Sequence, residues 1–191
     1  MAQMTLSGKE SFLPQPRPVE SSEKETCPFI VAVDTREQRP FIFAGLGLEI
    51  ITRRKTLKTG DYSILGLEKY VCVERKSKED LFGSCTSGRK RFEKELVRMS
   101  QMERSCVIVE CSMEDVKAGL PGSKIDPLSI VNTAIAWAGR YRVPWHFMPT
   151  RGDAEKAAYD HLRFAWQDLT SRTPLLSGLQ NGSESGNTVE N

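Results

Sequence analysis

The stretch VCVERKSKED, residues 71–80, constrains the fold more than any other part of the chain. It begins with alternating β-branched valines, which strands prefer, and it ends in a cluster of charged residues. Side chains alternate between the two faces of a strand, so Glu74 and Lys76 point to one face while Arg75 points to the other. The pattern predicts a strand that brings a carboxylate and an amine together at one end of a sheet.

Apolar runs and helical spacing predict an α/β domain around this strand. The predicted strands are 29–34, 48–52, 62–65, 70–75, 107–111 and 143–148. The predicted helices are 88–103, 126–139 and 152–169, with a short helix near 79–83. Because early strands are followed by alternating helix and strand, we expect a mixed central β-sheet flanked by helices on both faces.

The composition of the two ends predicts a single domain between two arms. Ser, Glu, Lys and Pro dominate residues 1–28, and Ser, Gly and Asn dominate residues 171–191. Such segments bury too little apolar surface to fold alone. We therefore expect a disordered N-terminal arm, a folded domain at 29–170 and a disordered C-terminal tail.

Charge and cysteine content limit the classes of function. A net charge of +2 is too balanced to identify a nucleic-acid partner, so any such binding must come from local basic clusters. The five cysteines include no C-x-x-C pair, which favours free thiols in a reducing compartment over a zinc site. The chain has no apolar run of about 18 residues and no signal-peptide pattern. We expect an intracellular protein that does not contact a membrane.

Acidic residues gather at the ends of the predicted strands. Asp34 ends the first strand, Glu37 follows it, and a hairpin can bring Asp61 close to Glu74. Carboxylates held close together repel one another, and a divalent cation removes that cost. Mg²⁺ prefers oxygen ligands, and it can polarise a phosphodiester and activate a bound water. Lys76, among carboxylates, should keep its proton and orient the attacking hydroxide or stabilise negative charge, rather than act as a general base.

Several spaced motifs together resemble the XPF-type structure-specific endonucleases. DTRE at 34–37, GD at 60–61 and ERKSKED at 74–80 fit the family signature G-D…E-R-K-x3-D. SCTSGRKRFEKEL at 84–96 resembles the start of the family's Ser-Gly-Arg helix, and the resemblance covers about 29–169. It implies a restriction-endonuclease-like core that cuts branched DNA, such as 3′ flaps or forks, with Mg²⁺ or Mn²⁺.

The resemblance also implies the residues of the site. The implied metal ligands are the carboxylates of Asp34, Glu37, Asp61 and Glu74 and the backbone carbonyl of Arg75. The expected catalytic residues are Asp34, Asp61, Glu74 and Lys76. Asp80 matches the last position of the signature, where it could orient Arg75 or Arg36 or cap the short helix.

Basic residues that could contact DNA phosphates lie in two clusters and beside the acidic residues. The set consists of Arg36, Arg54, Lys55, Lys58, Arg75, Arg89, Lys90 and Arg91. The cluster at 89–91 begins a predicted helix, where cations oppose the helix dipole, so phosphate binding is favoured over solvation. The cluster at 54–58 is more simply a solvated loop, although it could follow a DNA backbone. Arg36 could bind a phosphate or pair with the acidic residues.

One departure from the family leaves other functions open. Family members usually carry a tandem helix-hairpin-helix domain after the nuclease core, whereas this chain ends in a polar tail. We therefore expect a stand-alone bacterial or viral module of the cytoplasm or nucleoid, acting in DNA repair or recombination and able to form a homodimer through the nuclease core. Two alternatives are a non-catalytic DNA-binding or scaffold partner of a nuclease and a DNA nuclease without branch preference. The presence of every acidic and lysine position of the signature favours an active enzyme.

Overall fold

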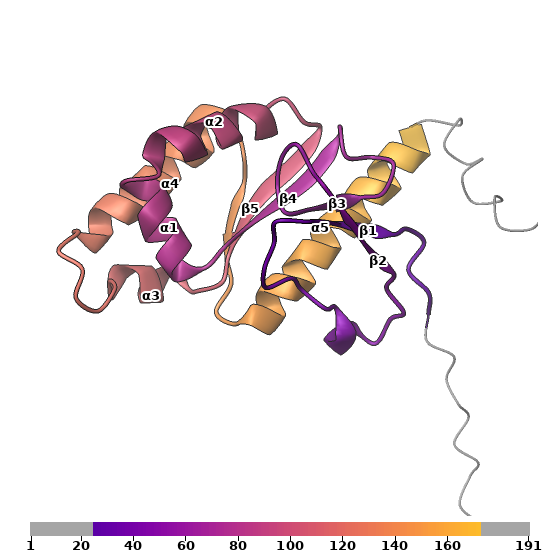
Figure 1. Ribbon diagram of the computed structural model, residues 1–191, viewed down its shortest axis with the longest axis horizontal. Helices are drawn as coiled ribbons and strands as arrows, with labels where there is room; N and C mark the ends of the chain where they lie inside the picture. Colours follow the sequence, from indigo (N-terminus) through magenta and orange to yellow (C-terminus); the bar gives the residue numbers. More distant parts are fainter. Residues whose placement is uncertain (1–24, 173–191) are drawn as a thin grey trace, which may run out of the picture.

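The computed structural model describes residues 25–172, which form one six-stranded mixed sheet in the order β2-β1-β3-β4-β5-β6 (Figure 1). The strands are β1 (Val31–Asp34), β2 (Thr52–Lys55), β3 (Tyr62–Ile64), β4 (Val71–Lys76), β5 (Arg104–Val109) and β6 (Trp145–Phe147). Strand β3 runs antiparallel to both β1 and β4, whereas the other neighbours are parallel. The mixed sheet predicted from the sequence is confirmed.

Helices cover both faces of this sheet. They are α1 (Lys78–Cys85), α2 (Arg89–Met99), α3 (Met113–Lys117), α4 (Pro127–Tyr141) and α5 (Arg151–Arg172), with a 3-10 turn η1 (Ala44–Leu46). Figure 1 shows α1 to α4 grouped on one side of the sheet, while α5 crosses the other side. No helix within residues 25–172 is long and apolar enough to cross a membrane.

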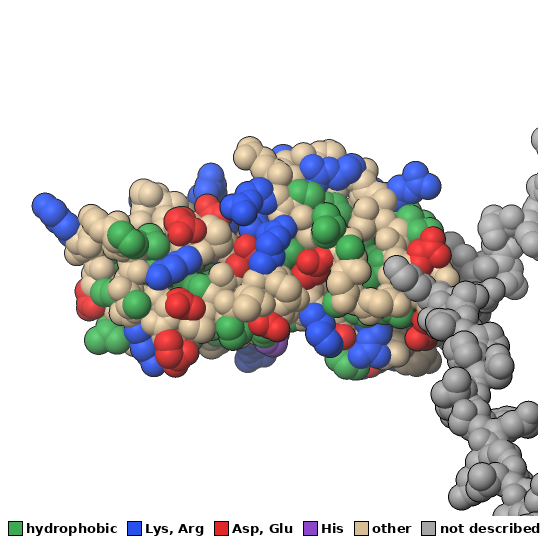
Figure 2. Space-filling view, turned by 90° about the horizontal axis from the view of Figure 1, so that it is seen from below, with side chains coloured by type: hydrophobic (Ala, Val, Ile, Leu, Met, Phe, Trp, Pro, Cys, Tyr) green, Lys and Arg blue, Asp and Glu red, His purple; other side chains and the backbone are tan. Residues whose placement is uncertain are grey.

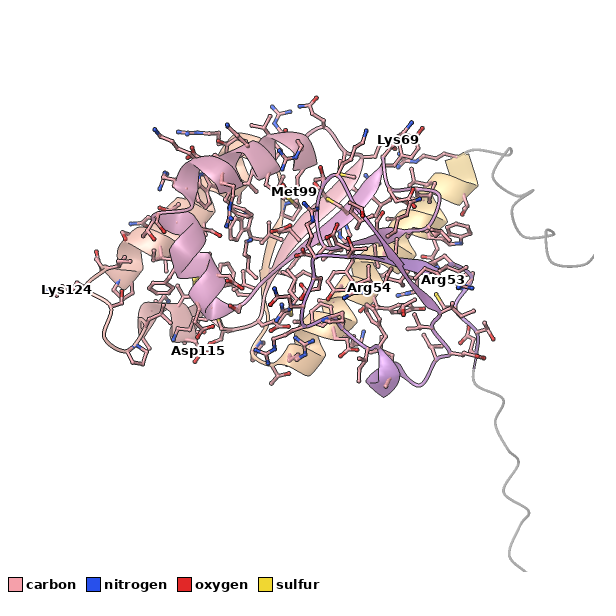
Figure 3. All side chains as sticks on the ribbon, viewed as in Figure 1. Arg53, Arg54, Lys69, Met99, Asp115 and Lys124 are labelled. Atoms are coloured by element: carbon pink, nitrogen blue, oxygen red, sulfur yellow. The ribbon has the colours of Figure 1, made fainter. Side chains whose placement is uncertain are left out.

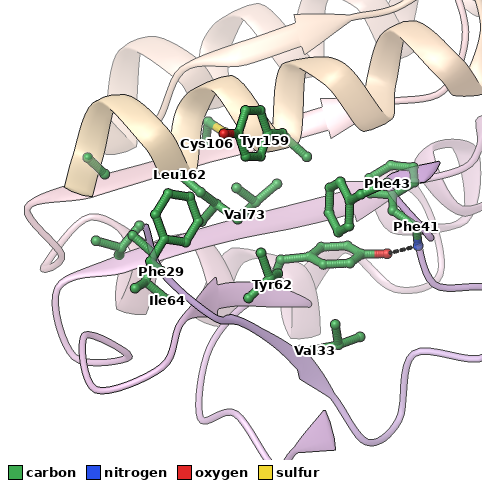
Figure 4. Packing of buried hydrophobic residues seen from close by; sticks show 14 of the residues in the cluster. Phe29, Val33, Phe41, Phe43, Tyr62, Ile64, Val73, Cys106, Tyr159 and Leu162 are labelled. Atoms are coloured by element: carbon green, nitrogen blue, oxygen red, sulfur yellow. Dashed lines mark hydrogen bonds between the residues drawn. The ribbon is translucent and has the colours of Figure 1, made fainter. Parts of the chain in front are cut away.

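The central strand β4 is apolar because both of its faces are buried. Val71 and Val73 join the cluster beneath α5, whereas Cys72 joins the cluster beneath α1, α2 and α4. In the first cluster the Tyr62 hydroxyl accepts a hydrogen bond from the Phe41 N–H at 2.8 Å, and their rings stack with centroids 5.0 Å apart (Figure 4). These aromatic contacts fix the segment that follows β1 against the sheet.

One predicted strand differs from the structure in its bounds. The second strand was expected at 48–52, but pairing with β1 begins at Thr52, opposite Val31. Leu48 and Ile50 pack against the core without joining the sheet. The apolar pattern at 48–52 therefore reflects burial of these side chains rather than strand pairing.

The two ends of the described fold also differ slightly from the expected domain limits. The packed core includes Cys27, which lies before the expected start at residue 29. All five cysteines are buried free thiols, as expected. The remaining parts of the predicted arms, 1–24 and 173–191, lie outside the described residues.

Candidate active site

A pocket of about 660 Å³ opens where β1 and β4 end and β3 begins. It is lined by the four predicted carboxylates and the predicted lysine, Asp34, Glu37, Asp61, Glu74 and Lys76. These residues are up to 42 positions apart in the sequence, from 34 to 76, and the sheet topology brings them to one place. The pocket is therefore the candidate active site.

Backbone hydrogen bonds fix Asp61 between two strands. The Asp61 N–H donates to the Val73 carbonyl at 2.8 Å, and the Asp34 N–H donates to the Asp61 carbonyl at 2.8 Å. The Arg75 N–H donates to Asp61 Oδ2 at 2.8 Å. Asp61 is thus held from the β1 side and from the β4 side, with its carboxyl group at the pocket.

The carboxyl groups of Asp61 and Glu74 are electrostatically coupled. Burial and the nearby Glu74 charge raise the pKa of Asp61 to about 8. Burial also raises the pKa of Glu74, although Lys76 acts in the opposite direction. Within residues 25–172 no hydrogen bond reaches Asp61 Oδ1 or Glu74 Oε2, so each group keeps one oxygen for an external ligand. One buried and one partly buried carboxylate, each with a free oxygen, form a donor set that fits a hard divalent cation.

The amine of Lys76 is held as a charged donor. Lys76 Nζ donates to Glu74 Oε1 at 2.7 Å and lies 4.3 Å from the centroid of the Phe92 ring. Burial acts to lower the pKa of Lys76, but the carboxylates of Glu74, Asp61 and Asp80 together outweigh it and raise that pKa. A proton held this firmly suits a group that stabilises negative charge, and it does not suit a general base.

Asp34 differs from the other acids because the protein itself satisfies its carboxylate. Arg36 donates to it through its backbone N–H at 2.7 Å and its Nε at 2.8 Å, and the Leu57 N–H donates at 2.7 Å. Burial acts to raise the pKa of Asp34, but these hydrogen bonds lower it overall. Of the two roles open to Arg36, the structure has it paired with the acidic residue, although 70% of its side chain stays exposed. Asp34 must release Arg36 before it can ligate a metal.

The side chain of Arg75 is buried on the opposite side of β4 from Lys76. Its guanidinium donates to both oxygens of Glu110, each at 2.7 Å, and approaches Glu37 at 3.4 Å. Only 6% of the Arg75 side chain is exposed, so DNA cannot reach it in this arrangement. The DNA contact expected from Arg75 therefore lacks structural support, and the residue instead holds Glu37.

Asp80 takes part in the N-terminal cap of α1, one of the roles that the sequence left open for it, whereas Glu110 orients Arg75. Asp80 does not orient Arg75: its N–H donates to the Ser77 hydroxyl at 3.1 Å, and Ser77 caps α1. Glu110 orients Arg75 and was not predicted. The sequence did contain a signal for Glu110, because the apolar run VIV at 107–109 ends in this acid, as β4 ends in charged residues. Since β4 and β5 are parallel, Glu110 lies at the same end of the sheet as Lys76.

The described residues do not form a ready-made metal cage. Within residues 25–172 no three Asp, Glu, His or Cys side chains are already close enough together to hold one metal ion. Three of the four acids instead face a cation of the chain: Asp34 faces Arg36, Glu37 faces Arg75, and Glu74 faces Lys76. The four-acid ligand set and the Arg75 carbonyl stay predictions, and the Asp61–Glu74 pair is the best-supported part of them.

The structure divides the basic cluster that begins α2. Arg91 lines the pocket, together with Arg39 and Arg98, which the sequence did not suggest. Arg89 instead lies 5.0 Å from the Trp137 ring centroid and pairs with Glu93 at 3.2 Å. Lys90 is exposed and lies outside the pocket lining.

The basic cluster at 54–58 lies beside the pocket and does not line it. Arg54 lies on the edge strand β2 (Figure 3). It donates to the carbonyls of Asp34 at 2.9 Å and Glu37 at 2.8 Å, so it holds the turn after β1. Lys55 pairs with Glu68, and Lys58 is exposed. On the face displayed in Figure 2, Lys and Arg side chains lie among acidic and apolar ones.

Comparisons with known proteins show which family and which solved structures the chain is similar to. The sequence profile of the ERCC4 domain matches residues 33–158. A solved structure of XPF from Aeropyrum pernix is similar, with a TM-score of 0.56 and 21% identity, over 84% of this chain and 69% of that chain. A structure of XPF from Aeropyrum pernix in complex with DNA has a TM-score of 0.56 and 24% identity, over 83% of this chain and 76% of that chain. No curated protein sequence matches significantly. The structural likeness confirms the predicted restriction-endonuclease-like fold.

Proposed function

The chain belongs to the ERCC4 domain family, and from this we propose that it is a divalent-metal-dependent endonuclease that hydrolyses phosphodiester bonds in DNA. The observation that carries the proposal is the grouping of Asp61, Glu74 and Lys76 in one pocket. Two coupled carboxylates with free oxygens favour a cation, and a charged amine beside them favours a reaction that builds negative charge.

Each of these groups has a part in the proposed reaction. Asp61 and Glu74 would hold Mg²⁺ or Mn²⁺, and a cation bound there polarises a phosphodiester and lowers the pKa of a bound water. Asp34 and Glu37 would complete the ligand set once their arginine partners move. Lys76 would orient the attacking hydroxide or stabilise the charge that develops on the phosphate oxygens. Attack in line leaves a 5′-phosphate and a 3′-hydroxyl.

The substrate in this proposal is branched DNA, such as a 3′ flap or a fork. Arginines at the mouth of the pocket, Arg36, Arg39, Arg91 and Arg98, would contact phosphates. One similar solved structure is an XPF in complex with DNA, which supports DNA as the substrate class. Cleavage without branch preference is the alternative, and a non-catalytic DNA-binding or scaffold role is disfavoured because the acids and the lysine are all present.

The biological setting is also part of the proposal. We place the chain in DNA repair or recombination inside the cell. A homodimer through the nuclease core is supported by Leu128 and Ile135 of α4, two apolar residues that are 57% and 61% exposed. Seven positions apart on a helix, they lie on one face that a second copy could cover.

Cleavage assays across DNA shapes test the proposed function. Purified protein should cut a 3′ flap or fork in Mg²⁺ or Mn²⁺ and should lose all cutting in EDTA. Glu74→Gln and Lys76→Ala should each lower the cleavage rate by at least about 100-fold, because each removes a group that acts on the transition state. DNA binding should persist in both.

The controls separate the parts of this proposal. Glu114→Gln changes an exposed acid of α3 that does not line the pocket, and this variant should cut DNA like the wild type. Full activity of Glu74→Gln or Lys76→Ala would refute the site. Equal cutting of a linear duplex and a flap would refute only the branch preference.

A further inference from the structure

The turn that carries Asp61 into the pocket is confined on one side by β4. Gly60 has a φ of +73°, a backbone conformation that residues with a side chain rarely adopt. A Cβ atom at this position would lie 2.9 Å from Cys72 Cβ and 3.0 Å from the Val73 carbonyl oxygen. No residue other than glycine fits this place without movement of β4. The Gly60 backbone is therefore pressed against the strand that also carries Glu74.

Helix α2 closes the turn from the other side through Glu95. Glu95 Oε1 accepts a hydrogen bond from the Gly60 N–H at 3.0 Å. Within residues 25–172, Glu95 is the only acceptor of the Gly60 N–H. The backbone groups of the next residue, Asp61, bond instead to β1 and β4. Glu95 Oε2 pairs with Arg98, so the carboxylate is held at both oxygens.

The packing of α2 explains why Glu95 reaches this turn. Phe92, Leu96 and Met99 are the buried face of the helix. Glu95 lies beside that face and lines the pocket with only 18% of its side chain exposed. Phe92 on the same helix contacts the Lys76 amine. The same helix thus touches the turn before Asp61 and the amine of Lys76.

We propose that Glu95 is a positioning residue, which fixes Asp61 for cation binding by accepting the hydrogen bond from Gly60. This inference rests on the proposed function, and Glu95 lies outside the G-D…E-R-K-x3-D motif. The bond needs an acceptor oxygen, which an amide can supply as a carboxylate does, although an ionised acceptor makes the shorter and stronger bond. A carboxylate at this position therefore restrains the turn before a metal ligand, as residues that support metal ligands commonly do.

The test is Mn²⁺ binding by the full-length chain without DNA, measured by calorimetry and by the electron paramagnetic resonance of free Mn²⁺. Glu95→Met keeps the side-chain length and the helix preference but removes the acceptor, and it should weaken Mn²⁺ binding about 10- to 100-fold. Glu95→Gln keeps an acceptor for Gly60 and should retain most of the wild-type affinity. Glu114→Gln serves as the surface control.

The outcomes separate this inference from the proposed function. A Glu95→Met protein that is folded by circular dichroism and binds Mn²⁺ like the wild type would overturn the inference. Equal weakening by Glu95→Gln and Glu95→Met would also overturn it, because charge and not the hydrogen bond would then matter. Were Glu95→Met unfolded, Glu95→Ala at the same position would decide between these results. Failure of the wild type to bind Mn²⁺, or undiminished binding by Asp61→Asn, would instead refute the proposed metal site.

Discussion

The carboxyl group of Asp61 lies in surroundings that favour a bound proton or cation. Its backbone is fixed by hydrogen bonds to β1 and β4, and the Arg75 N–H donates to its Oδ2, which holds the carboxyl group at the pocket that Glu74 also lines. Without a cation, the folded protein lowers the repulsion by keeping a proton on the pair, and the pKa of Asp61 rises to about 8. Proton and metal therefore compete for the same oxygens.

This competition predicts how stability depends on pH when no metal is bound. The folded protein holds the Asp61 proton more tightly than the unfolded chain, whose carboxyl has a pKa near 3.9. The stabilising contribution is therefore complete below about pH 4 and is lost as the pH rises toward 8. Urea unfolding in EDTA between pH 5 and 8 should show a falling free energy of unfolding, with a shallower fall in Asp61→Asn. An identical pH slope in the two proteins would contradict this.

At the scale of elements, a buried ion network joins β4, β5 and α5. Glu110, which follows β5, accepts from Arg75 of β4 and from Arg151 of α5, the latter at 2.6 Å. Arg151 also donates to the carbonyls of Arg39 at 2.7 Å and Pro40 at 2.8 Å. The network thereby holds the segment after β1, which carries Glu37, against the sheet.

Removal of the Glu110 carboxylate should destabilise the fold. Glu110→Ala leaves the buried Arg75 guanidinium without its fork partner, and it should lower the free energy of unfolding by about 3–5 kcal/mol. The exposed acid Glu114, changed to Ala, should lower it by no more than about 0.5 kcal/mol. Urea unfolding of the two variants at pH 7 measures both values. A loss in Glu110→Ala no larger than in the control would mean that the network does not stabilise the fold.

The face of α2 predicts which arginine binds DNA. Arg91 lines the pocket, whereas Arg89, two residues earlier, lies over Trp137 and pairs with Glu93. Arg91→Ala should weaken DNA binding and reduce the salt dependence of log K by about one phosphate contact, while Arg89→Ala should leave that slope unchanged. Fluorescence anisotropy over a range of salt concentrations gives both slopes. Equal slopes in the two variants would contradict the assignment.

Some elements could be predicted from the sequence because their signal is local. Strand β4 and the strand-end acids follow from alternation and from apolar runs, and the mixed sheet follows from their order. Helical spacing alone puts Leu128, Val131, Ile135 and Ala138 on one apolar stripe of α4. Of these, Val131 is buried but Leu128 and Ile135 are exposed, and the rest of the buried side is formed by Ile130, Ala134 and Trp137. Two apolar stripes share this helix, and only tertiary packing decides which one is covered.

In the candidate site too, the sequence pattern predicts the motif residues but not the partners that tertiary packing brings to them. The four acids and Lys76 were predicted because motif spacing carries them, and the structure places them in one pocket. The partners of Arg75 and of Gly60, which are Glu110 and Glu95, come from a later strand end and a later helix. Such pairings depend on how β5 and α2 pack against β4, and no pattern within a single segment contains that information.

At the scale of the whole molecule, the sheet separates two apolar clusters and brings the site to one end of its central strands. One cluster lies under α5 and the other under α1, α2 and α4. Each side supports the pocket: α5 does so through Arg151, and α2 does so through Phe92 and Glu95. The proposed function therefore depends on one arrangement, in which Asp61 and Glu74 share a cation beside Lys76.

The most direct measurement of that arrangement is anomalous diffraction from crystals of the full-length chain soaked in Mn²⁺. We predict an anomalous peak between the carboxylates of Asp61 and Glu74, next to the Lys76 amine, and its loss in Asp61→Asn crystals. A pocket that is open to solvent in the crystal and holds no peak there, at Mn²⁺ concentrations that support DNA cleavage, would contradict the account.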